Sequence, residues 1–363
     1  MKVERVVGPE VKRYTWSHDI PEQYMTNTIV RIYTDDGGEG VGAVANYTSF
    51  DYDRYTCETL RPLIPILIGK DPLKRETILR EIGSRVFPLP PGSVAAIDIA
   101  LWALYGKVCN QPIYKLLGGA RDKMTAYAST PMFEDVPAYI EFIGECVEEG
   151  FKAVKFHGWC LPEKDLPLAR AAKKEFPDVQ FMLDVENNYT RGQAIDAALE
   201  LEDLGFEWFE APLFDYDVEG YCEIRERSSM TVLPSGHWFQ DLETFKYALE
   251  SGAWSVARTD VTVMGGFTQG KKALALCESM GMRCECMSWG CSLVSMANFQ
   301  LMLAHNVSNY FEQAVPYPSY EYGMVETIRT NKDGTVNAPT KPGLGLEIDW
   351  PAMDKATLHT IST

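Results

Sequence analysis

Acidic, basic and imidazole side chains recur at the ends of short apolar runs such as AVKFH, LDVEN and NYFEQ. Seven run ends fall at positions 155, 184, 210, 237, 260, 287 and 312, at intervals of 23 to 29 residues. If these ends converge, their carboxylates form a costly cluster of negative charge unless a cation compensates it. Asp184, Glu210 and His237 are then candidate ligands of a divalent ion. The alternative is that each is a separate helix cap or surface residue.

Lys155 and His157 lie two residues apart on one predicted strand, so both side chains face the same side. A partly buried lysine close to a metal has a lowered pKa and can act as a general base near neutral pH. The alternative for Lys155 is a counter-ion of the neighbouring carboxylates.

The regular interval predicts the architecture that positions these residues. Each interval accommodates one strand, one helix and two loops, which parallel strands require. With residues 125–129 as the first strand, eight strands result, and the fold class is α/β with a modified (β/α)8 TIM barrel over residues 121–334. Active sites of such barrels lie at the carboxyl ends of the strands, where the run ends would meet.

The first 120 residues have a different pattern. Residues 28–33 and 40–45 alternate like two strands, and helical patterns follow over 76–86, 93–108 and 112–119. This pattern therefore predicts an α+β domain over residues 1–120, in which the strands come first and the helices follow. The segment 335–363 has no place in the barrel count and is expected to return to this domain.

Composition excludes several classes of function. The chain has 34 Lys and Arg against 51 Asp and Glu, a net charge of −17, which disfavours nucleic acid as a partner. No uninterrupted apolar run reaches 18 residues, so no membrane partner is expected, and the opening residues lack a signal-peptide pattern. Nine irregularly spaced cysteines fit buried thiols in a cytoplasmic protein.

Several motifs together resemble the enolase superfamily, specifically its mandelate racemase and muconate-lactonizing branch. The segment TIVRIYTDDGGEGVGAV resembles the capping-domain hairpin of that family, and AAIDIALWALYGKVCNQPIYKLLGG resembles its signature before the barrel. KAVKFH, LDVENN, WFEAP, RTDVTVMGG and NYFEQ follow in the order and spacing of the family, and PGLGLEIDW resembles its carboxyl-terminal return. The resemblance covers essentially the whole chain and implies an α+β N-terminal capping domain on a modified barrel.

The resemblance also implies roles for individual residues. Lys155 matches the lysine that usually removes the α-proton of a carboxylate substrate, and Asp184 and Glu210 match the first two ligands of Mg2+. Asp260 matches an aspartate that supports a histidine on the next strand, and Glu312 matches a glutamate that binds the substrate carboxylate.

His237 departs from the family pattern, which has a glutamate as the third metal ligand at this position. A neutral imidazole removes one negative charge from the ligands, so Mn2+ or another nitrogen-tolerant ion competes better with Mg2+. Alternatively, water takes the third place and the imidazole handles substrate.

Met287 is a second departure, because it stands where the family's base on the opposite face of the substrate, a histidine, would fall. Racemisation through two bases is therefore disfavoured, whereas one lysine suffices for β-elimination of water. The proton for the leaving hydroxyl would come from His157 or from Asp260 paired with Tyr189. Glu186 adds a carboxylate and suggests a substrate rich in hydroxyls.

These observations predict a metal-dependent dehydratase that converts an aldonic or aldaric sugar acid to a 2-keto-3-deoxy acid. The alternatives are an isomerase, epimerase or cycloisomerase with the same enolate, and a carbohydrate-acid-binding protein without turnover. Trp289 either walls the pocket or packs in the core, and Trp16 and Tyr47 lie on expected specificity loops. A small-molecule substrate and, from the resemblance, a homo-oligomer are expected.

Overall fold

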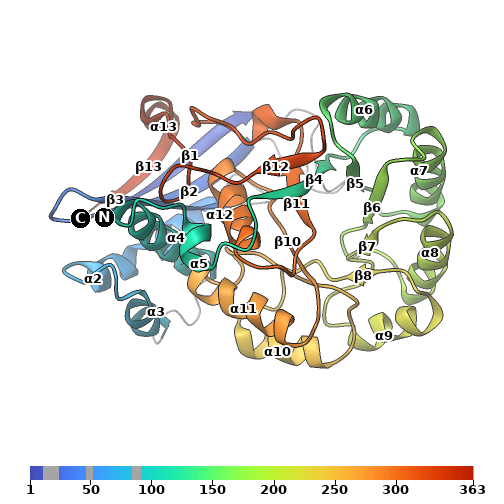
Figure 1. Cartoon of the computed structure of the whole chain (residues 1–363), viewed down its shortest axis with the longest axis horizontal. Coiled ribbons are helices and arrows are strands. Elements are labelled where there is room, and N and C mark those ends of the chain that lie inside the picture. Colours follow the sequence, from blue (N-terminus) through green and yellow to red (C-terminus); the bar gives the residue numbers. More distant parts are fainter. Residues whose placement is uncertain (11–23, 46–51, 84–90, 363) are drawn as a thin grey trace.

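The computed structural model describes residues 1–10, 24–45, 52–83 and 91–362. An antiparallel sheet and its helices form one part, and a ring of parallel strands surrounded by helices forms the other (Figure 1). The fold class predicted from the sequence, a modified (β/α)8 barrel with an α+β cap, is confirmed.

The antiparallel sheet has the strand order β13–β1–β2–β3. Its strands are β1 (Lys2–Glu10), β2 (Tyr24–Tyr33), β3 (Glu39–Ala45) and β13 (Thr357–Ser362). The sequence interpretation found β2 and β3 but missed β1, whose Glu4 and Arg5 interrupt the apolar alternation although both are buried.

Helix α4 (Pro91–Val108) lies against β3 at very short range. A Cβ atom on Gly40 would lie 2.0 Å from the carbonyl oxygen of Ala100, and one on Gly42 would lie 2.1 Å from that of Ala96. The DDGGEGVG segment therefore supplies glycines where the helix backbone touches the strand. The other helices of this part are α1 (Tyr52–Thr59), η1 (Arg61–Leu63), α2 (Ile64–Leu67), α3 (Arg75–Gly83) and α5 (Ile113–Leu117).

The barrel strands form the hydrogen-bonded order β11–β4–β5–β6–β7–β8, with β9 and β10 as a further parallel pair. Their bounds are β4 (Lys123–Thr130), β5 (Ala153–His157), β6 (Gln180–Asp184), β7 (Trp208–Glu210), β8 (Val232–Leu233), β9 (Ala257–Thr259), β10 (Cys284–Cys286) and β11 (Tyr310–Ala314). Backbone hydrogen bonds connect this pair to its neighbours on both sides. Ser255 N donates to Val232 O at 3.1 Å between β8 and β9, and Cys284 N donates to Val307 O at 2.9 Å between β10 and β11. All eight predicted strands are present, although β7 to β10 are shorter than the apolar runs.

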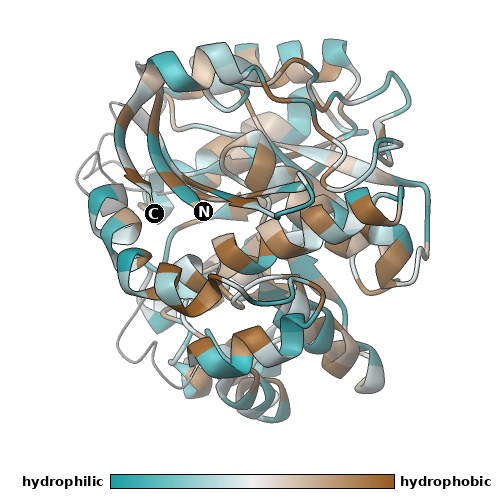
Figure 2. Cartoon of the chain, turned by 90° about the vertical axis from the view of Figure 1, so that its left-hand side faces the viewer, coloured by the Kyte–Doolittle hydropathy of each residue, from teal (hydrophilic) through white to brown (hydrophobic). Residues whose placement is uncertain are grey.

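Helices alternate with these strands around the outside of the ring (Figure 1). They are α6 (Val136–Glu149), α7 (Pro162–Glu175), α8 (Arg191–Asp203), α9 (Val218–Arg227), α10 (Leu242–Glu250), α11 (Phe267–Ser279) and α12 (Ser292–Leu303). Figure 2 shows hydrophobic and hydrophilic residues interleaved along the helices, as expected for elements with one buried face.

The carboxyl-terminal segment contacts both parts. After η2 (Tyr317–Ser319), strand β12 (Thr335–Asn337) pairs with β4 of the barrel, whereas α13 (Trp350–Ala356) leads into β13 on the first sheet. The domain limits 1–120, 121–334 and 335–363 stay predictions. Within the described part of the chain, no helix has the length and apolar character needed to cross a membrane.

Asp98 of α4 links the two parts. Its carboxylate is fully buried and accepts hydrogen bonds from the backbone N–H of Thr268 (2.9 Å) and from the Thr268 hydroxyl (2.7 Å) on α11. Trp102 donates to the same hydroxyl at 2.8 Å. Burial raises the pKa of Asp98 to about 6 despite these hydrogen bonds.

We predict that Asp98→Asn changes the pH dependence of folding. The pKa of Asp98 is about 6 in the fold against 3.8 for an ordinary aspartate, so its charged form destabilises the native state. The cost is absent below pH 3.8 and complete above about pH 6, where it amounts to roughly 3 kcal/mol. In urea unfolding between pH 4 and pH 7, wild type should lose stability relative to Asp98→Asn as pH rises. Asp196→Asn, on the exposed side of α8, is the control. Parallel stability curves for wild type and Asp98→Asn would contradict the argument.

Candidate active site

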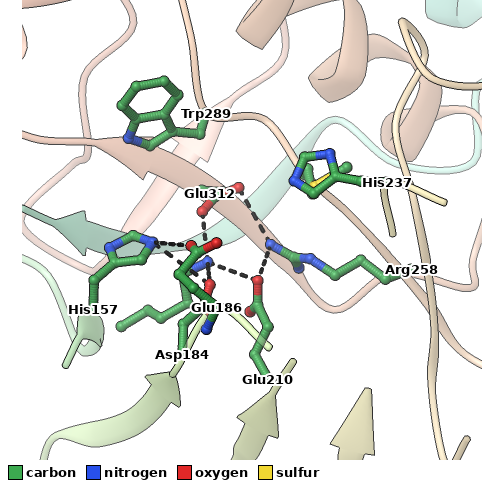
Figure 3. Close-up of a pocket in the computed structure, with 10 residues that line it drawn as sticks. His157, Asp184, Glu186, Glu210, His237, Arg258, Trp289 and Glu312 are labelled. Carbon is green, nitrogen blue, oxygen red and sulfur yellow. Dashed lines mark hydrogen bonds and ion pairs between the residues drawn. The ribbon is translucent and has the colours of Figure 1, made fainter. Parts of the chain in front are cut away.

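A pocket lies at the carboxyl ends of the barrel strands (Figure 3). The residues that line it are Lys155, His157, Asp184, Glu186, Glu210, His237, Arg258, Met287, Trp289 and Glu312. The structure thus brings together residues that the sequence analysis selected from six separate run ends.

Lys155 on β5 lies at the centre of the carboxylates. Its Nζ is 2.9 Å from Oε1 of Glu210, 3.1 Å from Oε1 of Glu312 and 3.2 Å from Oδ2 of Asp184. The side chain of Lys155 is only 2% exposed. Four strands, β5, β6, β7 and β11, therefore place one cation and three anions on the barrel axis.

The electrostatics of Lys155 differ from the sequence-based expectation of a lowered pKa. Burial alone would lower its pKa, but the charges of Glu210, Glu312 and Asp184 outweigh burial and raise it well above its ordinary value. The lysine is therefore protonated in this arrangement. It loses its proton readily only when another positive charge neutralises these carboxylates.

Arg258 is a pocket-lining residue that sequence reasoning missed. Its side chain is 1% exposed, and Nη2 lies 2.9 Å from Oε1 of Glu210 and 3.5 Å from Oε2 of Glu312. Its Nε and Nη1 have no hydrogen-bond partner among the described residues. A Cβ atom on Gly236 would lie 3.0 Å from Cγ of Arg258, so glycine leaves room for the arginine. A charged residue inside the apolar run WSVARTD was the available signal.

His157 has a defined hydrogen-bonding state. Its Nδ1 lies 2.6 Å from the carbonyl oxygen of Thr130 and its Nε2 faces the pocket, 3.5 Å from Oδ2 of Asp184. Burial, together with the charge of Lys155, lowers the pKa of His157 to about 4. The ring is therefore neutral at neutral pH. Because a carbonyl only accepts hydrogen bonds, Nδ1 carries the hydrogen and Nε2 presents its lone pair.

Glu186 reaches the pocket from an unusual backbone. Glu186 has φ of 51° and Asn187 has φ of 62°, both in the left-handed region that disfavours most side chains. The N–H of Glu186 donates to Oδ1 of Asp184 at 3.0 Å, and Asn187 N–H donates to the carbonyl of Ala211 at 2.7 Å. Such strain is held at functional sites by the surrounding contacts, here the ends of β6 and β7.

The pocket carries an excess of negative charge. When all four carboxylates, those of Asp184, Glu186, Glu210 and Glu312, are ionised, they outnumber the two cations, Lys155 and Arg258, and the balance is −4 + 2 = −2. Burial and the neighbouring Asp184 raise the pKa of Glu186 well above its ordinary value. Burial raises that of Glu210 to about 7 although Arg258 opposes the shift. One divalent cation would neutralise this excess, and carboxylate and imidazole donors fit such an ion.

The pKa of Glu312 shifts in the opposite direction to those of Glu186 and Glu210. Burial would raise its pKa, but Lys155, Arg258 and the N–H of Ser288, which donates to Oε2 at 2.9 Å, together lower it. It is ionised across the physiological range and adds a fixed negative charge at the end of β11.

His237, Trp289 and Met287 line the same pocket. Burial and the nearby Arg258 lower the pKa of His237 to about 4, so this ring is also neutral at neutral pH. In Figure 3 His237 lies beside Arg258, and His157 lies on the opposite side of the carboxylates. Trp289 lies at the pocket and also stacks edge-to-face on Tyr320, 5.1 Å between ring centroids, so both roles considered for it are combined.

Asp260 and Tyr189 do not line the pocket. The hydroxyl of Tyr189 donates to Oδ2 of Asp165 at 2.8 Å, and Asp165 accepts from the N–H groups of Trp159 and Leu161 at the start of α7. Asp260 is buried and accepts from the hydroxyl of Thr262 at 2.6 Å. The proton-transfer role expected of Tyr189 and Asp260 stays a prediction. Trp16 and Tyr47 lie outside the described residues.

Comparisons with known proteins agree with this geometry. Residues 138–352 match the family described as enolase C-terminal domain-like, and residues 19–118 match the mandelate racemase / muconate lactonizing enzyme N-terminal domain. A solved structure from Pseudovibrio sp., grouped with the mandelate racemase/muconate lactonizing enzymes, is 38% identical with a TM-score of 0.94, over 99% of this chain and 97% of its own.

Two relatives have more specific descriptions. The D-galactarolactone cycloisomerase of Agrobacterium fabrum is 28% identical over 348 residues, 90% of each chain. The D-glucarate dehydratase of Agrobacterium tumefaciens, solved in complex with magnesium, is 26% identical with a TM-score of 0.82, over 98% of each chain. An isomerase and a lyase are thus both among the similar proteins.

We predict that Arg258→Met lowers the free energy of unfolding by about 3 kcal/mol or more, because Glu210 and Glu312 lose a buried counter-charge. Arg258→Lys retains a charge and should lose less. Urea unfolding at neutral pH measures both, with Arg227→Met on an exposed helix face as the control. A stability of Arg258→Met equal to that of wild type would show that the arginine does not hold these carboxylates.

Proposed function

Because the chain belongs to the mandelate racemase/muconate lactonizing enzyme family of the enolase superfamily, we propose that it is a metal-dependent sugar-acid dehydratase. Its substrate would be an aldonic or aldaric acid. The reaction removes the proton α to the carboxylate and eliminates the β-hydroxyl as water, so the product is a 2-keto-3-deoxy acid.

The position of Lys155 carries this proposal. It is the one lysine among the pocket-lining residues, and its Nζ lies within 3.2 Å of three carboxylates at the strand ends. A buried amine held there by fixed anions is pre-positioned for an α-proton, since rigid neighbours define where Nζ lies. Met287, which follows β10, stands where a second base would face the other side of the substrate. A thioether cannot act as that base, which supports elimination over two-base racemisation.

The ion, Mg2+ or Mn2+, would neutralise the acidic residues and stabilise the charge of the enediolate. Lys155 then accepts the α-proton as general base, and the buried walls formed by Trp289 and Met287 limit access of water. Arg258 keeps Glu210 and Glu312 in place. Loss of the hydroxyl requires a proton, for which the newly protonated Lys155 is the candidate inside the pocket. The magnesium complex of the similar glucarate dehydratase supports this choice of ion.

A cycloisomerase is the second candidate, supported by the similarity to the galactarolactone enzyme. It would use the same α-proton abstraction but retain the oxygen within the product. The two functions differ in the hydration state of the product, so product analysis separates them.

We predict that Lys155→Ala lowers α-proton exchange about a thousandfold or more, because it removes the base while the barrel strands remain. Deuterium uptake from D2O into a sugar acid that the wild-type protein converts, followed by NMR, measures this effect. Lys174→Ala, on the exposed face of α7, is the matched control. Exchange that survives in the folded Lys155→Ala protein would remove this lysine from the base role.

We predict that incubation with Mg2+ or Mn2+ and a panel of aldonic and aldaric acids in D2O yields a 2-keto-3-deoxy acid from at least one member. Mass spectrometry and NMR follow water loss and deuterium uptake together. A deuterated acid or rearranged lactone without water loss would favour the isomerase. Neither signal, with metal-dependent binding of an acid retained, would favour a binding protein.

A further inference from the structure

A second pocket lies at the contact between the two parts of the chain. Helix α4 of the cap packs against both α3 of the cap and α11 of the barrel (Figure 1), and the pocket opens where these three helices meet. The residues that line it are Leu73, Lys74, Arg75, Glu76, Thr77, Trp102, Thr268 and Lys271, none of which lines the candidate active site. A ligand bound here would therefore contact both parts of the chain.

Three cations of this second pocket have no acidic partner. Lys74, Arg75 and Lys271 form no ion pair with any residue that the structure describes. The acid that lines the pocket, Glu76, is engaged by Nζ of Lys272 at 2.9 Å, outside the lining residues. The three positive charges are therefore available to a ligand.

The guanidinium of Arg75 is held in place by aromatic rings. Its Cζ lies 4.2 Å from the centroid of the Trp102 ring and 4.1 Å from that of Tyr105. Stacking of this kind stabilises an arginine and fixes its orientation. Nη1 of Arg75 is buried and has no hydrogen-bond partner among the described residues. An unpartnered buried donor is costly, and an acceptor bound in the pocket would remove this cost.

The charge balance around the second pocket is positive. Burial lowers the pKa of Arg75 although the charge of Asp98 opposes the shift, so this acid does not fully compensate the guanidinium. With both nearby acids ionised the balance is +4 − 2 = +2, whereas the whole chain carries −17. The groups counted are Lys74, Arg75, Lys271 and Lys272 against Glu76 and Asp98. A hollow lined by one sign of charge attracts ligands of the opposite sign.

The hydrogen-bonding groups narrow the class of anion. The hydroxyl of Thr268 is already engaged, because it donates to Asp98 at 2.7 Å and accepts from an indole N–H at 2.8 Å. The charged groups that stay available, those of Lys74, Arg75 and Lys271, are all donors. A ligand that offers only acceptor oxygens fits them. A phosphate group carries about −1.5 to −2 near pH 7, which matches the local balance better than a single carboxylate does.

We propose that this second pocket binds a phosphate group, carried by inorganic phosphate or by a phosphate monoester, between α3 and α11. Arg75 and Lys271 would donate to its oxygens from the cap and from the barrel, so the bound anion links the two parts. The site is independent of the proposed dehydratase, because it shares no lining residue with the candidate active site. A ligand that binds the native state alone also raises the free energy of unfolding.

Isothermal titration calorimetry of inorganic phosphate against the full chain, with Mg2+ present, tests the proposal. Wild type should bind phosphate, and Lys271→Met should weaken this binding at least about tenfold, because a charged donor is lost while the apolar stem remains. Lys246→Met, whose side chain on α10 is 57% exposed, is the matched control and should bind as wild type does. Absence of binding in wild type would overturn the proposal. So would equal affinity in folded Lys271→Met, the result expected if phosphate binds at the active-site ion.

The melting temperature gives a second readout. Phosphate should raise the Tm of wild type and of Lys246→Met, and should raise that of Lys271→Met and Arg75→Met much less. Sodium chloride at equal ionic strength separates this effect from screening, and circular dichroism verifies that each variant folds. Shifts of equal size in all four proteins would contradict the assignment.

A hexose phosphate distinguishes the two sources of the phosphate group. Tighter binding of the hexose phosphate than of inorganic phosphate would identify a monoester as the ligand, and weaker binding would identify free phosphate. Either ligand should lose affinity in Lys271→Met, and a ligand that does not would bind elsewhere and overturn the proposal. None of these measurements uses a sugar acid, so their outcome does not depend on the dehydratase assay.

Discussion

Burial of charge at the barrel axis is the constraint on which the site depends. Lys155 and Arg258 are almost fully buried, and each contacts Glu210 and Glu312, so no member of the group can leave without exposing another buried charge to a low-dielectric interior. Four strands must therefore end at the same level. The barrel supplies that alignment, and the charges in turn define where a ligand or ion can bind.

The constant interval between run ends allowed much of this to be predicted from the sequence. Parallel strands joined by helices repeat at a nearly fixed length, so polar residues such as Lys155, Asp184, Glu210 and Glu312 could be assigned to one end of one ring. The prediction succeeded because it needed only strand order and alternation, which the apolar pattern encodes directly.

Side-chain partnerships were less predictable. Arg258 lies within β9, and its long side chain extends into the pocket. A search for polar residues at the ends of apolar runs does not find a residue in that position. Tyr189 and Asp260 follow strands as the functional acids do, yet Asp165 and Thr262 engage them locally. The sequence also could not show that Arg258 contacts Oε1 of Glu210, because that contact joins residues 48 positions apart (258 − 210 = 48).

The pairing of β1 with β13 has a consequence for synthesis on the ribosome. Residues Lys2 to Val6 pair with Thr357 to Ser362, so during translation β1 gains one neighbour, β2, early and the other, β13, only after the barrel has been translated. Until then one edge of β1 stays open to other strands. Vectorial folding thus leaves the cap sheet with an unpaired edge while the barrel, whose strands lie between residues 123 and 314, can already close.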